Sequence, residues 1–157
     1  MSIAFVGLGS NLGDRRKNLE RACLLMKEHG LAIQKQSDIE ETDPVDLLAQ
    51  PKFLNQIVTI QTELSPRVLL DLLLSIENDM GRVRDLPKGP RIIDLDILLY
   101  DDIIYTDERL VIPHPAVCDR DFVLRHIIQI DSERRDPRSG VLFKEVCNGK
   151  FSDKKCS

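Results

Sequence analysis

The chain has 157 residues, about the length of one domain, and 42% of them are apolar and 31% charged. It can therefore build a core, and we expect one folded domain over residues 1–157. The formal net charge of −4 argues against a general nucleic-acid binder, which would have a basic excess. No apolar run reaches the roughly 20 residues that cross a bilayer, and residues 1–7 lack the basic stretch of a signal peptide. We expect a cytoplasmic monomer with neither a membrane nor a nucleic-acid partner.

The N-terminal third of the sequence predicts a strand, a helix and a second strand. Residues 3–9 read as a strand that runs into the turn formers of residues 9–14, where Asp14 can cap a helix. Apolar residues then recur at helical spacing up to Gly30, a typical C-terminal stop. Residues 31–37 alternate as in a strand, whereas residues 38–52 show neither period and are expected to form a functional loop.

The middle of the chain predicts a strand, the clearest helix and another strand. Residues 53–61 alternate, and Ser65-Pro66 is a typical helix start. Gly81 ends this helix, whose expected buried stripe is Val68, Leu69, Leu72, Leu73 and Ile76. Residues 92–100 read as a buried strand, followed by a turn at residues 101–102 and a short helix over residues 120–130. Beyond residue 132 the chain is polar, and its last residues are expected to be frayed.

This order of elements predicts an α+β fold. The expected architecture is a ferredoxin-like two-layer sandwich, a βαββαβ antiparallel sheet with helices on one face, followed by a C-terminal helical extension. The four cysteines, at positions 23, 118, 147 and 156, form no Cys-x-x-Cys pair, so we expect reduced thiols.

Two aspartates in the last predicted strand form the sharpest local motif. Asp94 and Asp96 are two residues apart, so their side chains share one face of the strand, with α-carbons roughly 7 Å apart. Two desolvated anions this close repel unless a proton, an arginine or a divalent metal intervenes. Mg²⁺ prefers carboxylate oxygens together with substrate phosphate. The alternative is that both aspartates point to solvent.

A cationic loop precedes these aspartates. It carries Arg82, Arg84, Lys88 and Arg91 against one acid. Guanidinium groups suit phosphate oxygens, and a metal beside a cation clamp is typical of sites that transfer phosphoryl-type groups. The alternative is a solvated charge run. There is no Walker-type glycine motif, and among the three histidines only His114, between two prolines, is expected at a ligand.

The motifs together resemble a known family. They include Gly9-Ser10-Asn11-Leu12-Gly13, Phe53-Leu54-Asn55, Gly81-Arg82-Val83-Arg84, Gly89-Pro90-Arg91-Ile92-Ile93-Asp94-Leu95-Asp96, Pro113-His114 and Arg120-Asp121-Phe122. In order and spacing the chain is similar to the 6-hydroxymethyl-7,8-dihydropterin pyrophosphokinases of folate biosynthesis. The resemblance implies transfer of pyrophosphate from ATP to the hydroxymethyl group of the pterin, with AMP as the second product.

The resemblance also implies roles for individual residues. Asp94 and Asp96 would hold two Mg²⁺ ions, and with Arg82 and Arg91 they would form the catalytic set. The residues implied for ATP binding are Glu77, Arg82, Arg84, Arg91, Ile97, Arg109, Leu110, His114 and Arg120. Those implied for the pterin are Thr42, Pro44, Val45, Phe53, Asn55 and Phe122, with the two phenylalanines covering the ring and Asn55 pairing with its polar edge. Ordinary core packing is the alternative for the phenylalanines.

The sequence departs from the family pattern at four positions. Lys88 stands where the family usually has a large aromatic residue, Ile92 replaces a common Thr, Asp43 a common Pro, and Phe53 a frequent Tyr. No general base is evident. Two other function classes fit parts of the pattern: a polymerase-β-type nucleotidyltransferase, and a ferredoxin-like regulatory module that senses a small molecule. The spacing between Ser10 and Asp94 speaks against the first, and the charged constellation speaks against the second.

Overall fold

The computed structural model describes residues 1–44, 50–82 and 91–149, with side chains up to residue 146. Its elements in chain order are β1 (Ser2–Ser10), α1 (Arg15–Glu28), β2 (Ala32–Gln36), β3 (Glu40–Thr42), β4 (Phe53–Thr62), α2 (Pro66–Asp79), β5 (Asp94–Tyr100), β6 (Tyr105–Thr106), β7 (Val111–Ile112), α3 (Asp121–Ile130) and α4 (Phe143–Gly149). Arg84 and Val45 therefore lie outside the described residues, as does the end of the chain that was expected to fray.

The central sheet has the order β2-β4-β1-β5, all antiparallel, and β3 pairs with the other end of β4. Each helix of the βαββαβ core joins two strands that have a third strand between them. This is the ferredoxin-like order, so the expected fold is confirmed. In the β1–β5 register, Gly9 lies opposite Asp94 and Gly7 opposite Asp96.

Both long helices begin and end where the sequence indicates. Asp14 accepts a hydrogen bond from the backbone N–H of Lys17, and Ser65 does the same for Val68, with Pro66 in the first turn of α2. Gly30 and Gly81 follow the two helices with φ values of 86° and 85°, a conformation that favours glycine.

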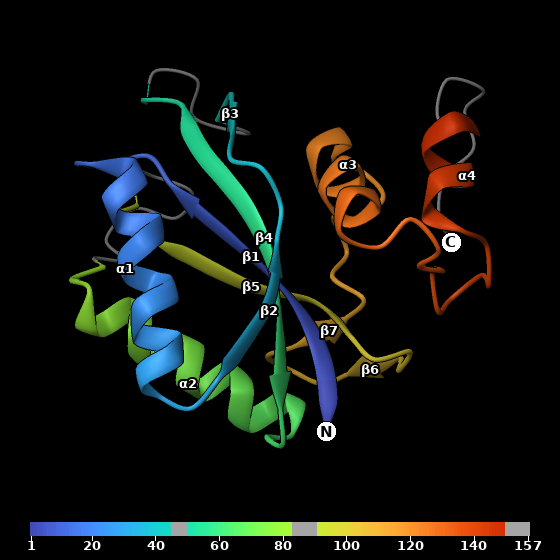
Figure 1. Ribbon diagram of the computed structural model, residues 1–157, viewed down its shortest axis with the longest axis horizontal. Coiled ribbons are helices and arrows are strands. Elements are labelled where there is room, and N and C mark those ends of the chain that lie inside the picture. The colour runs from blue at the N-terminus through green and yellow to red at the C-terminus, as the bar shows by residue number, and fades with distance from the viewer. Residues whose placement is uncertain (45–49, 83–90, 150–157) are drawn as a thin grey trace.

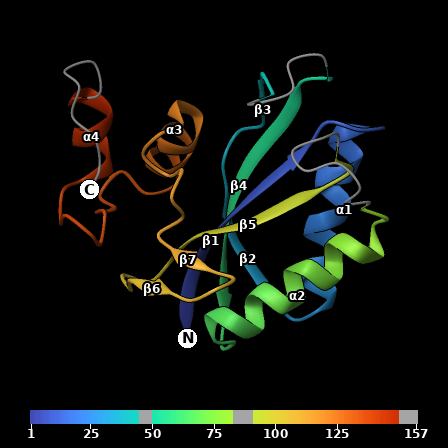
Figure 2. The ribbon, with the colours of Figure 1, turned by 180° about the vertical axis from the view of Figure 1, so that it is seen from behind.

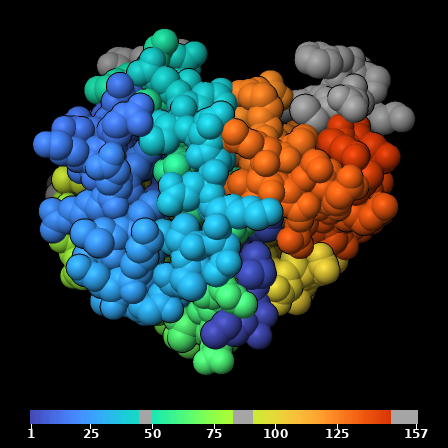
Figure 3. All heavy atoms as spheres, in the orientation of Figure 1, coloured from blue at the N-terminus to red at the C-terminus, as the bar shows by residue number. Residues whose placement is uncertain are grey.

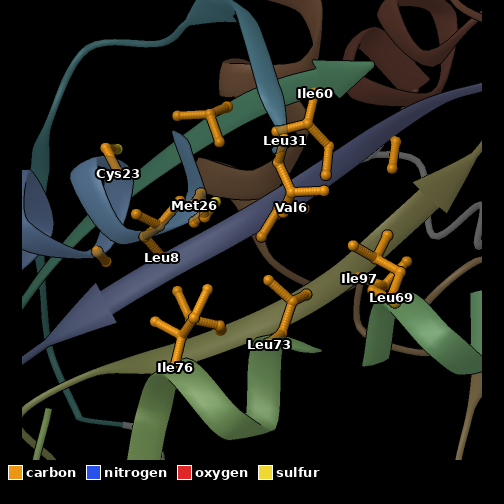
Figure 4. Close-up of a cluster of buried hydrophobic side chains, with 14 of the residues drawn as sticks. Val6, Leu8, Cys23, Met26, Leu31, Ile60, Leu69, Leu73, Ile76 and Ile97 are labelled. Carbon is orange, nitrogen blue, oxygen red and sulfur yellow. The ribbon is translucent and has the colours of Figure 1, made fainter. Parts of the chain in front are cut away.

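Helices α1 and α2 cover one face of the sheet (Figure 1). Figure 4 shows Leu69, Leu73 and Ile76 of α2 pointing into the same cluster as Val6 of β1 and Met26 of α1. Val68 was expected in this stripe but is 49% exposed. It lies roughly 100° around the helix from Leu69, beyond the edge of the face that the sheet covers.

The C-terminal part of the chain covers the opposite face of the sheet. Helices α3 and α4 lie on the side away from α1 and α2 (Figures 1 and 2). Phe5, Ile57 and Leu99 of the sheet pack there against Leu124 of α3 and Phe143 of α4, all almost fully buried. The C-terminal extension expected from the sequence is thus a second helical layer.

Four short elements and one bond were not expected from the sequence. These elements are β3, the β6–β7 hairpin and α4. Cys118 takes part in a disulfide bond, so the expectation of four reduced cysteines is wrong. Folding brings cysteines together that are far apart in the sequence, and this pairing needs no local motif. Cys23 is a free, buried thiol. Over the described ranges, no helix has the length and apolar character needed to span a bilayer.

Candidate active site

A cavity opens on the α3 side of the sheet, between the strands and the N-terminal end of α3. Eight residues with an expected site role line it: Thr42, Phe53, Asn55, Arg91, Asp94, Asp96, Arg120 and Phe122. They come from β3, β4, β5, the segment before β5 and the start of α3. The fold therefore gathers residues from positions 42 to 122 at one place.

The two aspartates line this cavity together, so they share one face of β5 as their spacing indicates. Burial, followed by the negative charges of Asp94 and Glu77, raises the pKa of Asp96 to about 7, although Arg120 and Arg82 oppose the shift. A cation that binds beside Asp96 would therefore stabilise the charged form of this carboxyl group. Two carboxylates with open space beside them fit Mg²⁺, which takes its remaining ligands from water and phosphate.

Two arginines neutralise Asp94. One NH group of Arg82 lies 2.8 Å from Oδ1 of Asp94, and one NH group of Arg91 lies 3.3 Å from Oδ2. Arg82 is largely buried, and its Nε has no hydrogen-bond partner within the described part of the chain. The cationic loop was expected to face the aspartates, and its two ends do so. Of these two arginines, Arg91 lines the cavity, where its guanidinium group suits an incoming phosphate oxygen.

Glu77 of α2 connects this cluster of charged side chains to strand β5. Its Oε2 lies 2.7 Å from the NH group of Arg82 and accepts a hydrogen bond from the backbone N–H of Leu95, also at 2.7 Å. Its side chain is 1% exposed and is not part of the cavity lining. Glu77, expected near ATP, thus contacts Arg82 and strand β5 directly.

Four of the six residues expected at the pterin line the same cavity: Thr42, Phe53, Asn55 and Phe122. Phe53 on β4 and Phe122 on α3 line it from two elements, and both are half-buried. The amide of Asn55 donates a hydrogen bond to Oγ1 of Thr42 and lies 3.4 Å from the carbonyl oxygen of Glu40. Pro44 is buried and is not among the lining residues.

Four other described residues expected at ATP do not line this cavity: Ile97, Arg109, Leu110 and His114. His114 follows β7; its Nδ1 accepts a hydrogen bond from the backbone N–H of Ala116. Burial and the charge of Arg120 lower the pKa of His114, and Asp94 opposes them. Ile97 and Leu110 are buried in the core beneath α2, and Arg109 forms a 2.7 Å ion pair with Asp71.

Sequence reasoning missed the glycines of the cavity floor and the connecting role of Asn11. Gly7 and Gly9 line the cavity from β1, and their spacing of two in a strand is a signal that one face lacks side chains. Asn11 is 1% exposed; its amide donates to Gln50 and to the carbonyl oxygen of Pro51, and its Oδ1 accepts from the backbone N–H of Arg91. An Asn in a turn is too common to indicate such a role.

Across the parts of the chain that the structure describes, no group of three or more His, Cys, Asp or Glu side chains could hold a metal ion. A site with two carboxylates does not need one, because Mg²⁺ is commonly bound through one or two carboxylates plus substrate phosphates. The donor set is therefore suited to a metal that arrives with a nucleotide.

Comparison with known proteins identifies one family. The model of 7,8-dihydro-6-hydroxymethylpterin-pyrophosphokinase (HPPK) matches residues 5–132. The 2-amino-4-hydroxy-6-hydroxymethyldihydropteridine pyrophosphokinase of Bacillus subtilis is 45% identical over 82% of this chain and 78% of its own length. The protein of the same name from Methylorubrum extorquens is 44% identical over 83% of both chains. The folic acid synthesis protein fol1 of Schizosaccharomyces pombe is 41% identical over 92% of this chain but only 20% of its own length.

Solved structures agree on the fold. The crystal structure of an HPPK-DHPS in complex with substrates matches with a TM-score of 0.74 at 16% identity, over 98% of this chain and 44% of that chain. Plasmodium falciparum HPPK-DHPS with pteroate matches with a TM-score of 0.74 at 17% identity, over 96% of this chain and 42% of that chain. This chain thus spans less than half of the length of these proteins, and at such identity the likeness shows the fold alone.

Proposed function

The chain belongs to the 7,8-dihydro-6-hydroxymethylpterin-pyrophosphokinase family, and on this premise we propose how its residues carry out the family's reaction. The enzyme uses ATP and acts in folate synthesis: the hydroxymethyl oxygen of 6-hydroxymethyl-7,8-dihydropterin attacks the β-phosphorus of ATP. The bond between that phosphorus and the oxygen bridging it to the α-phosphorus breaks, and AMP leaves with this oxygen. The assignment of the site rests on one observation. The same cavity is lined by the charged residues Asp94, Asp96 and Arg91 and by Phe53, Asn55 and Phe122.

Asp94 and Asp96 would hold two Mg²⁺ ions that arrive with ATP. When bound, these ions neutralise phosphate charge and favour attack at the β-phosphorus. The raised pKa of Asp96 supports this assignment, because burial next to two other carboxylates leaves this group poorly compensated. Asp96 would hold the ions as the carboxylate, because metal ligands must be deprotonated.

Arg82 and Arg91 would bind the phosphates. Both contact Asp94 in the structure, and the contact of Arg91 is the longer one at 3.3 Å. We expect ATP phosphate oxygens to replace Asp94 as the partner of Arg91, while Glu77 keeps Arg82 in place. The remaining proposed nucleotide residues are Arg84, Ile97, Arg109, Leu110, His114 and Arg120. Among these, Arg120 lines the cavity, and its charge acts on both Asp96 and His114.

The pterin would lie between Phe53 and Phe122. A pterin offers two flat faces and an edge of alternating donors and acceptors, which two rings and an amide can match. Asn55 is the amide at the right place, and Thr42, Pro44 and Val45 are proposed to complete the edge contacts. No side chain is assigned as a general base. A cytoplasmic location and the monomeric state remain predictions from the sequence.

The identity of the nucleotide that is formed from ATP tests this function directly. Protein, Mg-ATP and reduced hydroxymethylpterin are incubated together, and the nucleotide product is identified. AMP together with a pyrophosphorylated pterin is expected. ADP would instead indicate an ordinary kinase, and free pyrophosphate a nucleotidyltransferase.

Removal of either aspartate tests the metal assignment. Asp94→Ala and Asp96→Ala are each expected to lower kcat by at least about 100-fold, because a carboxylate that holds metal and phosphate contributes mainly in the transition state. Circular dichroism should show a folded protein. Turnover at the wild-type rate in either variant would contradict the assignment.

A further inference from the structure

Helix α3 carries one wall of the cavity but is fixed on the sheet mainly by apolar contacts. Val123, Leu124, Ile127 and Ile130 face the core, while Arg120 at its start makes no side-chain cap hydrogen bond. Apolar contacts are not directional, so they leave the exact rotation and height of a helix weakly determined. Polar contacts between α3 and the strand segments beside it add a directional restraint on the position of Phe122.

The side chain of Glu40 on β3 contacts two residues of α3 that lie three and four positions after Phe122. Its Oε1 lies 3.1 Å from Nε2 of His126, and its Oε2 accepts a hydrogen bond from Arg125. His126 is 4% exposed, whereas the side chain of Arg125 is half exposed. In Figure 3 the atoms of α3, in orange, lie directly against the cyan atoms around β3.

The state of the His126 ring follows from its contacts. Its Nδ1 is buried without a hydrogen-bond partner in the part of the chain that the structure describes. A proton on Nδ1 would have no acceptor, so the neutral ring carries its proton on Nε2 and donates it to Glu40. Burial also lowers the pKa of His126, although Glu40 opposes the shift. The contact of His126 with Glu40 is partly buried and therefore less screened by water than the exposed contact of Arg125 with the same carboxylate.

His126 in turn contacts Phe122 on the same face of α3. The two residues are one helical turn apart, with ring centroids 6.1 Å apart and planes at 69°, an edge-on arrangement. The backbone carbonyl of Glu40 lies 3.4 Å from the amide of Asn55, which also donates to Thr42. Glu40 is thus linked to Phe122 through its side chain and His126, and it is close to the Asn55 amide through its backbone carbonyl.

We propose that Glu40 is a positioning residue for the pterin, acting through His126 to set the place of Phe122 relative to Asn55. This inference rests on the proposed function, because it takes the cavity between these residues as the pterin site. It concerns only the pterin half. The residues expected at the phosphates make no described contact with Glu40 or His126.

Kinetics with both substrates test the proposal. In Glu40→Ala and His126→Leu, the KM for the reduced pterin is expected to rise about tenfold, as for loss of a hydrogen bond to a charged group. The KM for Mg-ATP and the kcat at saturation should stay within about twofold. Calorimetric titration with the pterin should show a matching loss of affinity. Glu40→Gln, which keeps an acceptor oxygen, should show a smaller loss and serves if Glu40→Ala does not fold.

Two further variants separate positioning from general docking of the helix. His126→Gln keeps an N–H donor close to the place of Nε2 and should recover most of the affinity lost in His126→Leu. Gln129→Ala removes another contact of α3 with the sheet edge, the 2.8 Å hydrogen bond from the backbone N–H of Asp38, but does not involve Phe122. It should leave the KM for the pterin unchanged.

These experiments distinguish failure of the positioning role from failure of the proposed function. If wild-type protein forms no AMP, the function itself is wrong. If wild type forms AMP but the pterin KM is unchanged in the Glu40 and His126 variants, only the positioning role is wrong. An equal rise in Gln129→Ala, or a fall in kcat with constant KM, would also overturn it.

Discussion

Burial and the carboxylates of Asp94 and Glu77 raise the pKa of Asp96 to about 7, from an ordinary value of 3.8. The native protein therefore binds more protons than the unfolded chain between about pH 4 and pH 7. The contribution of Asp96 to the free energy of unfolding is therefore greatest below about pH 4, and it declines as the pH rises to about 7. The feature that prepares the site for a cation thus lowers the stability of the fold at neutral pH.

Asp96→Asn is expected to remove this pH dependence. With EDTA present, the variant should have a higher urea midpoint than wild type at pH 8 and no such advantage at pH 4. Asp119→Asn, at an exposed position, is the control and should show the same small difference at both values. A constant difference between Asp96→Asn and wild type across the range would contradict the raised pKa.

Gly9 is a second residue whose identity is constrained by the residues around it. A Cβ at this position would lie 3.3 Å from Oδ1 of Asn55 and 3.5 Å from Cδ1 of Phe53. Both neighbours belong to the proposed pterin site, and the Asn55 amide is held by Thr42. A side chain at Gly9 would therefore crowd the Asn55 amide that is proposed to pair with the pterin edge.

Gly9→Ala is expected to weaken pterin binding about tenfold, since overpacking costs about 1–3 kcal/mol and would displace the amide. Gly7→Ala is the matched control on the same strand and face. The three atoms nearest to its Cβ would all belong to Leu98, with Cδ1 the closest at 3.3 Å, and Leu98 is not among the residues proposed for the pterin. Calorimetric titration should show a clearly smaller effect for Gly7→Ala, and equal effects would show that the position of Asn55 is not decisive.

At the scale of elements, α2 and β5 are joined by one buried carboxylate. Glu77 accepts the backbone N–H of Leu95 and pairs with Arg82, and it is 1% exposed. Removing this carboxylate would leave the backbone N–H of Leu95 without its acceptor and would leave Arg82 with one carboxylate partner, Asp94, instead of the two it contacts. The helix that covers the sheet therefore also sets the position of the strand that bears the aspartates.

Glu77→Ala is expected to lower the free energy of unfolding by about 3 kcal/mol and to reduce turnover, because Arg82 and Asp94 lose their support. Asp71→Ala on the same helix breaks only the exposed pair with Arg109 and should cost less than about 1 kcal/mol. Urea denaturation of both variants gives the comparison. Similar losses in the two would contradict the role assigned to Glu77.

The elements that the sequence predicted well are those with a complete local signal. The helices after Asp14 and Ser65 and the strands around them follow from a cap, a period and a stop. The elements β3, β6 and β7 are two or three residues long, too short to show a period. Val68 was misplaced because spacing defines a stripe but not its width, which depends on the surface that covers it.

On the scale of the whole molecule, the sheet is covered on both faces. The second layer includes α4, which follows the region matched by the family model. Phe143 of α4 is fully buried beside α3 and reaches the same cluster as Phe5 of the sheet. The site lies between the sheet and this second layer, so the stability of the layer bears on the shape of the cavity.

Phe143→Ala is expected to lower the free energy of unfolding by about 3–5 kcal/mol, the usual cost of deleting a buried phenylalanine side chain. Val141→Ala, two residues earlier and 38% exposed, should cost less than about 1 kcal/mol. Urea denaturation followed by circular dichroism measures both. A small loss for Phe143→Ala would show that the second layer contributes little to the stability of the fold.

The sequence by itself determined the order of the main elements, the shared face of Asp94 and Asp96, and the family motifs, because each depends on residues close together in the chain. Only the tertiary structure decided which elements close the cavity, that Gly7 and Gly9 form its floor, and that Glu40 lies beside His126. Glu40 and His126, for example, are 86 residues apart in the sequence. Local spacing carries no information about such pairs, since sheet order and helix docking arise from burial of the whole apolar surface.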